Sequence, residues 1–385
     1  MKLKNKIYQF YHWEYFWLSV IVLITMLLHL SVINVPHSFM YDEKYYVWDA
    51  RNILTTHQYE QTLGNPPLGK LFITAGILLF GDNPLGWRFF SVIFGSLSLV
   101  LFYLICRKLN LSRTLSSIGV YIYGFENLTF VQASIATLDV YLNTLLLASF
   151  LFYLNRKYFS SGISLGLGVL VKVSGILAGP TIFMHWLLSK SKKTLSFFYI
   201  TVPLLFSIFI LMPLFDFAVY FKFANPFIRI REILSLSVML TYKNTIHEAL
   251  SRPWEWILRY EPLPYWKAPK YIMGMSFSIW ILIIPIFIYL IYKSIKRDEA
   301  GIFGLSWFSG LYLLWIPVSI LTDRVTYLYY IYPAVGSICL GITLIINDLL
   351  KNNSKHKWIF ITLIIGFLIY HFVEYARYST LFSFY

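Results

Sequence analysis

The sequence predicts an all-α polytopic membrane protein, folded as a single domain over residues 1–385, with about eleven transmembrane helices. Three observations carry this prediction. Hydrophobic residues make up 58% of the chain, the mean hydropathy is +0.64, and only 13% of residues are charged, whereas soluble domains carry about 25%. The 12 Trp, 30 Tyr and 33 Phe are typical of a chain that crosses many membrane–water interfaces.

A spanning helix needs roughly 20 apolar residues. Along the chain, this criterion gives segments that start near Tyr15, Trp87, Thr114, Thr137, Phe159, Val173, Leu195, Ile272, Ile302, Tyr327 and Trp358. The first segment is too long for a secretory signal and is not followed by a small-residue cleavage site, so we expect it to remain as an anchor. No connection is long enough to hold a large soluble domain.

Basic clusters alternate with connections that lack them, and this alternation predicts the orientation of the chain. The clusters are Lys2/Lys4/Lys6, Arg107/Lys108/Arg113, Arg156/Lys157, Lys190/Lys192/Lys193, Lys293/Lys296/Arg297 and Lys351/Lys355/Lys357. Because cytoplasmic connections are enriched in Lys and Arg, we expect these clusters and the N-terminus in the cytoplasm and the C-terminus outside. The net charge of +14 then follows from membrane orientation and does not indicate nucleic-acid binding.

Two long connections, 34–86 and 218–270, remain on the predicted outer side. The first contains a segment whose apolar side chains suit an amphipathic helix on the membrane surface: Tyr45, Trp48, Ile53 and Leu54. The second carries Arg252 among Trp254, Trp256 and other basic residues, a composition that suits a lipid phosphate. An ordinary interfacial belt of aromatic and basic residues has the same composition, so this pattern alone leaves both interpretations open.

Few ionisable residues lie in or beside apolar segments, and these are the candidates for chemistry. Asp42 and Glu43 follow the first span directly, where dehydration can make a carboxylate a usable base, although such a pair is more often solvated surface. Asp139 lies near the outer end of a span, where a charge is costly unless it is functional. Lys172, between two segments, either joins the site or extends to the interface. Cys106 and Cys339 lie in apolar stretches and suggest neither a disulfide framework nor a metal site.

Several stretches, taken in chain order, resemble the protein O-mannosyltransferase family, and more broadly the GT-C superfamily of polytopic glycosyltransferases. They are Asp42-Glu43, Asn65-Pro-Pro-Leu-Gly-Lys70-Leu, the stretch from Gly81 to Gly95 with Arg88, Ala136-Thr-Leu-Asp139, Gly168-Val-Leu-Val-Lys172-Val-Ser-Gly175, Ser251-Arg252-Pro-Trp-Glu-Trp256, and Arg324 to Pro333. Each match is weak alone, and the ordered set is specific. Asn65 departs from the histidine that is usual in the family. The β-trefoil domain of the eukaryotic enzymes has no place in this chain, which indicates a prokaryotic member.

The resemblance implies a glycosyltransferase that uses a polyprenyl-phosphate sugar and inverts the anomeric centre in a single displacement. It implies that Asp42 is the base and that Glu43 orients it or binds acceptor or sugar. Cations must stabilise the departing phosphate, and the candidates are Arg88, Lys70, Arg252 and Arg324. Asn65, Asp139 and Lys172 are expected to line the donor or substrate site. No metal ligand set is evident and no cofactor is required, although His247 and Glu43 are a candidate pair for a divalent cation.

The expected partners are the sugar donor, a protein acceptor with Ser or Thr hydroxyls, and membrane lipids. Mannose is the sugar that the resemblance implies, and the reaction is expected at the extracytoplasmic face of a prokaryotic cell membrane. A transferase with a lipid or glycan acceptor, like the aminoarabinose transferases, shares Asp42-Glu43 and the stretch at Asn65. A transporter of lipid-linked sugars is a further alternative, but it would show internal symmetry or polar residues through the membrane depth. The sequence is compatible with a dimer and does not require one.

Overall fold

The computed structural model describes residues 14–58, 61–189, 195–266, 271–351 and 357–378. Most of these residues are helical. The first half of the chain contains α2 (Phe16–Val32), α3 (Glu43–Thr55), α4 (Leu68–Phe80), α5 (Pro84–Lys108), α6 (Arg113–Gly124), α7 (Asn127–Ser134), α8 (Leu138–Leu154), α9 (Tyr158–Val171), η1 (Val173–Leu177) and α10 (Ala178–Leu188).

The second half contains two strands, π-helical turns and further helices. In order these are α11 (Leu195–Phe206), η2 (Ser207–Leu211), α12 (Met212–Tyr220), α13 (Pro226–Met239), α14 (Glu255–Leu258), β1 (Leu263–Trp266), β2 (Tyr271–Met273), α15 (Phe277–Trp280), α16 (Ile283–Ile295), α17 (Glu299–Phe308), η3 (Ser309–Leu313), α18 (Trp315–Thr322), η4 (Leu328–Ile331), α19 (Tyr332–Lys351) and α20 (Lys357–Tyr378).

Within the described residues, five helical stretches are long and apolar enough to cross a membrane, or six if a bent pair counts as one span. The five are Pro84–Lys108, Ser196–Tyr220, Glu299–Thr322, Leu328–Lys351 and Lys357–Tyr378, and the bent pair is α7 with α8. Shorter apolar helices, α2, α4, α9, α16 and the stretch Val173–Leu188, fall below the length of a full span. The predicted all-α membrane fold is therefore confirmed in class, while the predicted count of eleven and the orientation of the termini stay predictions.

Two predicted boundaries differ from the structure. The segment expected from Ile272 begins instead as β2, which pairs antiparallel with β1, and helix resumes only at α15. Gly274 explains the delay, because its φ of 156° suits an extended turn that L-residues rarely adopt. The first outer connection, 34–86, is also more ordered than predicted, since α4 follows the expected helix α3. In α3, Tyr45 and Trp48 are exposed whereas Ile53 is buried, so the four predicted apolar residues do not share one face.

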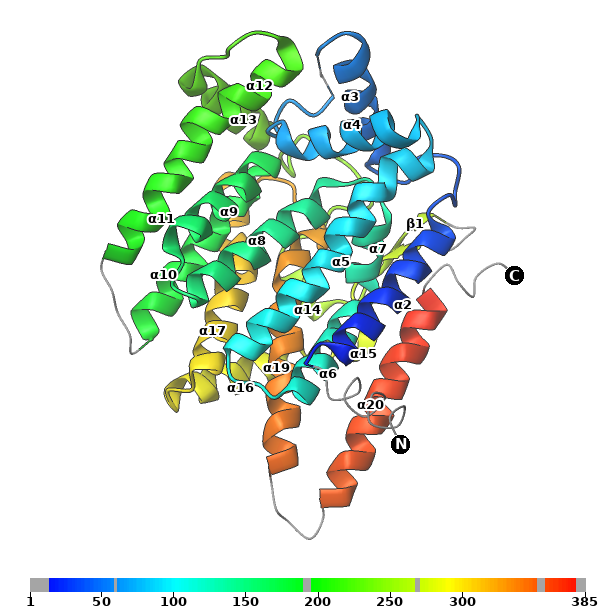
Figure 1. Cartoon of the computed structure of the whole chain (residues 1–385), viewed down its shortest axis with the longest axis vertical. Helices are drawn as coiled ribbons and strands as arrows, with labels where there is room; N and C mark the ends of the chain where they lie inside the picture. The colour runs from blue at the N-terminus through cyan, green and yellow to red at the C-terminus, as the bar shows by residue number, and fades with distance from the viewer. Residues whose placement is uncertain (1–13, 59–60, 190–194, 267–270, 352–356, 379–385) are drawn as a thin grey trace, which may run out of the picture.

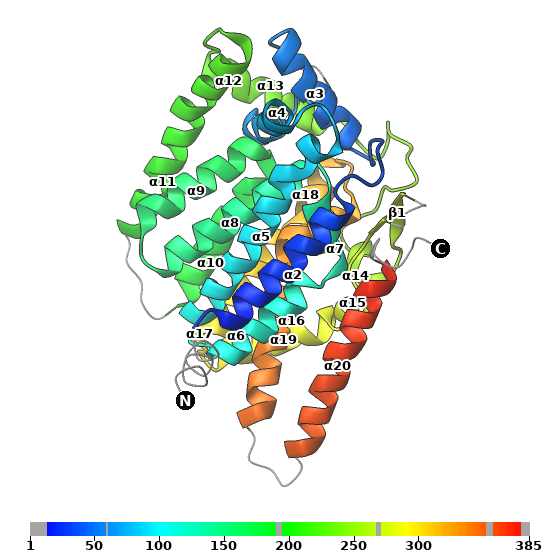
Figure 2. The same cartoon turned by 45° about the vertical axis from the view of Figure 1, so that its right-hand side comes forward.

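The helices form a central bundle, and the longer helices of the two long connections lie at one end of it (Figure 1). Figure 1 shows α3, α4, α12 and α13 gathered at the top of the molecule, while the C-terminal ends of α16 and α19 lie toward the bottom. In both views, α11 and α20 stand at opposite flanks and α5, α8 and α19 lie between them (Figures 1 and 2). The α19 span is almost entirely buried, and most of α20 is exposed. The exposed apolar side chains on the flanking helices are those expected to face lipid.

The basic turns meet at the end opposite α3. Side chains from the α5–α6, α8–α9 and α10 ends and from the start of α17 line one cavity there, and Arg297 donates to the carbonyl of Leu188 at 3.3 Å. This arrangement agrees with the predicted grouping of these clusters on one side of the membrane. Lys2, Lys4, Lys6, Lys190, Lys192, Lys193 and Lys355, which belong to the same prediction, lie outside the described residues.

Candidate active site

A buried ion pair fixes the start of the connection 34–86. Arg88, in the first turns of α5, donates through Nε and Nη2 to the two carboxylate oxygens of Glu43, both at 2.8 Å, and neither side chain is exposed. Its remaining N–H groups donate to the carbonyls of Ile33, Pro36 and Ser38. All five guanidinium donors of Arg88 are thereby used within the protein. Arg88 consequently holds the backbone that precedes Glu43 and has no donor left for a phosphate.

Glu43 links this connection to a break in a spanning helix. Besides Arg88, its carboxylate accepts from the backbone N–H of Met40 and of Ala136, each at 2.8 Å. Ala136 lies in the extended break between α7 and α8, where the helix axis bends by 114°. Broken helices at membrane depth occur where they line a cavity or are buried in protein. Glu43 therefore places its neighbour Asp42 close to Asp139, which lies in the first turn of α8.

The turn before α3 points the adjacent carboxylates of Asp42 and Glu43 in different directions. Tyr41 has a φ of 47°, an uncommon value for a bulky residue, and its ring stacks on that of Tyr265 at 4.7 Å. Glu43 points into the protein, whereas Asp42 lines a cavity and accepts a hydrogen bond from the Tyr329 hydroxyl at 3.2 Å. Burial raises the pKa of the Asp42 carboxyl from 3.8 to about 6, and the positive charge of Lys172 and the Tyr329 hydrogen bond oppose this increase.

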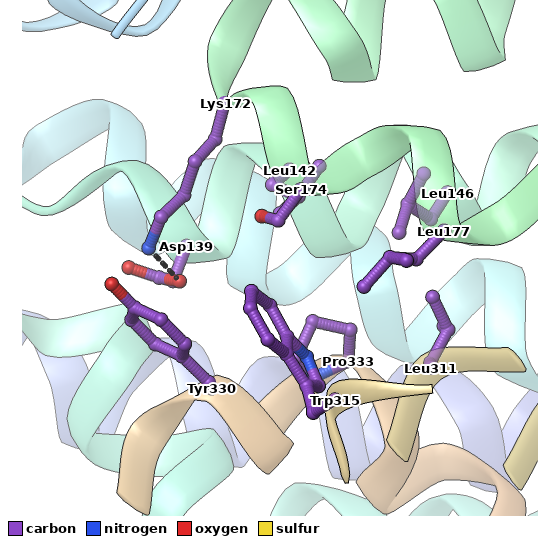
Figure 3. A pocket seen from close by; sticks show the side chains of 10 residues that line it. All are labelled: Asp139, Leu142, Leu146, Lys172, Ser174, Leu177, Leu311, Trp315, Tyr330 and Pro333. Carbon is purple, nitrogen blue, oxygen red and sulfur yellow. Dashed lines mark hydrogen bonds and ion pairs between the residues drawn. The ribbon is translucent and has the colours of Figure 1, made fainter. Parts of the chain in front are cut away.

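Lys172 and Asp139 form a second charged pair beside Asp42. Lys172 lies in the extended link between α9 and η1, and its Nζ is 2.8 Å from Oδ1 of Asp139. The ammonium also lies over the rings of Tyr330 and Tyr329, at 4.6 and 5.2 Å from their centroids. Figure 3 shows Lys172 reaching toward Asp139 beside the hydroxyl of Tyr330, with Trp315 and leucine side chains on the other side. The predicted alternative, that Lys172 only extends to the interface, does not describe this geometry.

Two cavities adjoin at this point. The larger, about 600 Å³, is lined by Asp42, by polar residues that include Lys44, Gln61 and His247, and by several tyrosines. This size is typical of sites for small molecules. The smaller, about 160 Å³, is mainly apolar, with Leu177, Trp315 and Val318 beside Lys172. Both cavities are lined by Asn65, Ser237, Arg324 and Tyr330.

Arg324 is the cation at the junction of the two cavities. In the part of the chain that the structure describes, its guanidinium makes no hydrogen bond or ion pair, and the side chain is partly exposed. His247 faces the larger cavity near Asp42, and its Nδ1 accepts from the backbone N–H of Ala249 at 3.1 Å. That bond leaves Nε2 as the ring nitrogen that carries a proton in the neutral side chain.

The other predicted phosphate ligands lie elsewhere. Lys70 is fully buried in α4, and its Nζ donates to the carbonyls of Thr62 and Asn65 at 2.9 Å, so it shapes the connection instead of facing a cavity. Arg252 pairs with Asp323 at 2.7 Å and lies 3.6 Å from the centre of the Tyr242 ring. Neither residue lines the cavities at Asp42. These geometries argue against the phosphate roles predicted for Arg88, Lys70 and Arg252, and against direct substrate binding by Glu43.

The contacts of Glu43 do not favour its predicted pairing with His247 around a cation, which stays a prediction. Both oxygens of that carboxylate are occupied by Arg88 and by the backbone N–H groups of Met40 and Ala136. Across the described ranges, no three His, Cys, Asp or Glu side chains lie close enough together to hold a metal ion.

An aromatic cluster around Asp42 was not predicted in detail. Tyr327 and Tyr329 stack at 5.6 Å, Tyr330 packs edge-on against Tyr329 at 5.0 Å, and Tyr41 lies edge-on to Tyr329 at 6.4 Å. The sequence does contain a signal for this cluster, because three of these tyrosines fall within the six residues that follow Arg324. What the sequence does not reveal is that the stretch folds back on Asp42.

Comparison with known proteins shows which family part of this chain resembles. Residues 64–215 match the family model described as dolichyl-phosphate-mannose-protein mannosyltransferase. This segment is similar to the protein O-mannosyltransferase family, and the match covers less than half of the chain. The predicted resemblance is confirmed, and the motifs at Asn65, Arg88, Asp139 and Lys172 lie within the matched segment. Asp42-Glu43, the stretch at Arg252 and the stretch from Arg324 lie outside it.

Curated O-mannosyltransferases match over a similar portion. The polyprenol-phosphate-mannose–protein mannosyltransferase of Mycobacterium tuberculosis is 29% identical over 138 residues, which is 34% of this chain and 26% of that protein. In this match the chain spans about a quarter of the curated relative's length. A longer match, 24% identical over 337 residues, joins 83% of this chain to 61% of an uncharacterised protein of Aquifex aeolicus.

Solved structures share the fold over nearly the whole chain. The Saccharomyces cerevisiae O-mannosyltransferase Pmt1–Pmt2 complex bound to its sugar donor superposes with a TM-score of 0.76, at 11% identity, covering 96% of this chain and 90% of that one. ArnT from Cupriavidus metallidurans superposes with a TM-score of 0.56, at 14% identity, covering 95% and 74%. The chain therefore shares its fold with these enzymes, and its apolar helices together with this fold make it an integral membrane protein.

Proposed function

We propose that the protein is a glycosyltransferase that moves mannose, or a related hexose, from a polyprenyl phosphate to Ser or Thr hydroxyls of protein acceptors. The observation that carries this proposal is Asp42, a carboxylate whose pKa is raised to about 6 and which faces a cavity of about 600 Å³ beside Lys172 and Arg324. A base whose pKa lies near neutral pH, next to fixed cations, suits the transfer of a sugar from a phosphate leaving group. The similarity of residues 64–215 to the O-mannosyltransferase family supports the choice of donor.

In this mechanism, the acceptor hydroxyl lies in the large cavity and gives its proton to Asp42 as its oxygen bonds to the anomeric carbon. The bond from that carbon to the phosphate oxygen breaks on the opposite side, so the anomeric configuration inverts. The electron pair leaves with the polyprenyl phosphate, and no general acid is needed because phosphate is a stable leaving group. Arg324 and Lys172 neutralise the charge that develops on the phosphate.

The smaller cavity suits the lipid end of the donor. Its apolar lining at Leu177, Trp315 and Val318 would receive the first isoprene units, and the phosphate would lie at Arg324, where the two cavities adjoin. Asn65 lines both cavities and would contact the phosphate or the sugar. We place this end of the molecule at the extracytoplasmic face of a prokaryotic membrane, because the basic turns lie at the other end.

A transfer assay tests the function. Purified protein in nanodiscs is incubated with radiolabelled polyprenyl-phosphate mannose and a Ser/Thr-rich peptide. Label on the peptide hydroxyls supports the proposal. Label on added membrane lipid with none on the peptide would replace the protein acceptor with a lipid one. No consumption of donor by folded protein would overturn the proposal.

Replacing Arg324 with alanine is expected to weaken donor binding by roughly 10- to 100-fold, because hydrogen bonds to charged groups contribute about 1.5–3 kcal/mol. Acceptor affinity should change much less. The measurement is the donor Kd by titration with polyprenyl phosphate. Arg259→Ala is the matched control, since Arg259 is an outer arginine that pairs with Glu255 and Glu261 and does not line either cavity. Equal weakening in both variants would contradict the role of Arg324.

The pH dependence should follow Asp42. Because the base must be ionised, kcat/KM is expected to fall as the pH drops through about 6. The Tyr329 hydrogen bond lowers the pKa of Asp42, so Tyr329→Phe should move this acidic limb to higher pH. Tyr289→Phe is the control, because it removes a similar hydrogen bond to Asp348 at the opposite end of the molecule. An unchanged limb in Tyr329→Phe would show that Asp42 does not control the profile.

We further propose that transfer needs no divalent cation, because Lys172 and Arg324 supply the positive charge at the phosphate. Treatment with EDTA, followed by dialysis, is expected to leave the rate of transfer unchanged. The check is the same transfer assay with and without added Mg²⁺ or Mn²⁺. A rate that disappears with EDTA and returns with the ion would contradict this mechanism.

A further inference from the structure

A second polar cavity lies at the end of the molecule opposite Asp42. Its volume is about 160 Å³, and it is formed where the α5–α6 and α8–α9 turns meet the C-terminal end of α10 and the N-terminal end of α17. Lys108 and Arg156 contribute positive charge to its lining, and Glu299 contributes a half-exposed carboxylate. The reaction proposed above uses none of these residues.

A buried histidine faces this cavity. His185 is almost fully buried in α10, and its Nδ1 lies 3.0 Å from the hydroxyl of Tyr153. Its Nε2 lies 3.2 Å from Oε1 of Glu299 but, among the described residues, it makes no hydrogen bond of good geometry. A buried ring nitrogen without a well-aligned partner is costly, and a ligand in the cavity would satisfy it.

Two of the helices that form the cavity, α9 and α10, also carry exposed apolar side chains. Phe159 follows the lining residue Tyr158 directly and is 61% exposed, and Leu187 lies between the lining residues His185 and Ser189 and is 48% exposed. Exposed apolar side chains on a membrane protein face acyl chains. The cavity itself combines charged lining residues with the apolar Leu109 and Leu154, beside helices that carry exposed apolar side chains, and this combination suits an amphipathic ligand better than a soluble one.

We infer that this cavity binds the phosphodiester headgroup of an anionic membrane phospholipid. Lys108 and Arg156 contact the phosphate, and Glu299 and the His185–Tyr153 pair contact headgroup hydroxyls. Two cations and one carboxylate in the lining leave an excess of positive charge, which suits the negative charge of such a headgroup. Basic pockets between spanning helices on the cytoplasmic side are known to suit anionic lipids.

The site would tie four turns together. Lys108 is the last residue of α5, Arg156 follows α8, His185 lies in the last turn of α10, and Glu299 begins α17. A ligand held by all four would resist their separation during unfolding, because binding to the folded state alone stabilises it. Thermal stability is therefore the direct readout, and it does not depend on the transfer reaction.

The test uses the full chain, purified and delipidated in mild detergent, with phosphatidylglycerol, phosphatidylcholine or inorganic phosphate added. Phosphatidylglycerol is expected to raise the unfolding temperature by several degrees, and phosphatidylcholine and free phosphate are not. The Lys108→Gln/Arg156→Gln variant should lose this increase. Lys296→Gln/Lys351→Gln, which removes two cations from the same end outside the cavity, should keep it.

Three results would overturn the inference. Equal stabilisation of the two double variants would show that phosphatidylglycerol acts through general surface charge. Equal stabilisation by inorganic phosphate would identify a site for a soluble anion instead of a lipid. No stabilisation of the unsubstituted protein by phosphatidylglycerol would exclude the lipid from the cavity.

Discussion

Replacing Asp42 with asparagine is expected to reduce the rate of sugar transfer by about 10²- to 10⁴-fold, which is the usual contribution of a positioned general base. Asparagine keeps the shape of the side chain and can still accept the Tyr329 hydrogen bond, but it cannot take up the acceptor proton. The measurement is single-turnover transfer from radiolabelled donor, with donor and acceptor both above their dissociation constants.

The folded state should tolerate this substitution. Because burial raises the pKa of Asp42, the ionised carboxyl is less favourable in the folded protein than in water. Its contribution to stability is fully present only below pH 3.8 and is lost as the pH rises through about 6, so at neutral pH asparagine removes an unfavourable charge. The unfolding temperature of Asp42→Asn should therefore match or exceed that of the unsubstituted protein.

Asp82→Asn is the matched control for Asp42→Asn. Asp82 lies in the same outer connection, where it accepts from Trp87 and Arg51, and its side chain is 44% exposed. It should retain nearly full activity. Turnover of Asp42→Asn at the rate of this control would remove Asp42 from the role of base.

The membrane fold could be predicted because apolar length is a local property. Most predicted segments coincide with helices, as at Phe159 and Trp358, which lie at the starts of α9 and α20. Boundaries set by tertiary contacts could not be predicted in this way. The start of α15 depends on the pairing of β1 with β2, and the bend at Ala136 depends on a carboxylate 93 positions earlier in the chain.

The site could be predicted only in part, for the same reason. Motif positions pointed to Asp42, Asp139, Lys172 and Arg324, and these four come together around the adjoining cavities. The sequence could not distinguish a cation that faces a cavity from one whose hydrogen-bond donors are all used by groups inside the protein. Arg88 and Arg324 look equivalent in a list of motifs, and only the folded chain shows that Arg88 uses every donor internally.

Because Arg88 is fully bonded inside the protein, its replacement is expected to lower the stability of the fold. Arg88→Ala is expected to destabilise the protein by about 3–5 kcal/mol, because it leaves the fully buried Glu43 carboxylate without its partner. It also removes the donors to three carbonyls of the connection that carries Asp42. Arg88→Lys should rescue little of this loss, since an ammonium has three donors and lacks the planar fork that spans both oxygens of Glu43.

Arg51→Ala provides the comparison, since it breaks an ion pair in the same connection that is exposed to solvent. The side chains of Arg51 and Asp82 are 32% and 44% exposed, so this pair should contribute no more than about 1 kcal/mol. Thermal unfolding in detergent, read by intrinsic tryptophan fluorescence, would rank the variants. If Arg88 bound the donor phosphate instead, Arg88→Ala would keep the unfolding temperature of the unsubstituted protein and lose donor affinity. The structure predicts that pattern for Arg324→Ala and the opposite one for Arg88→Ala.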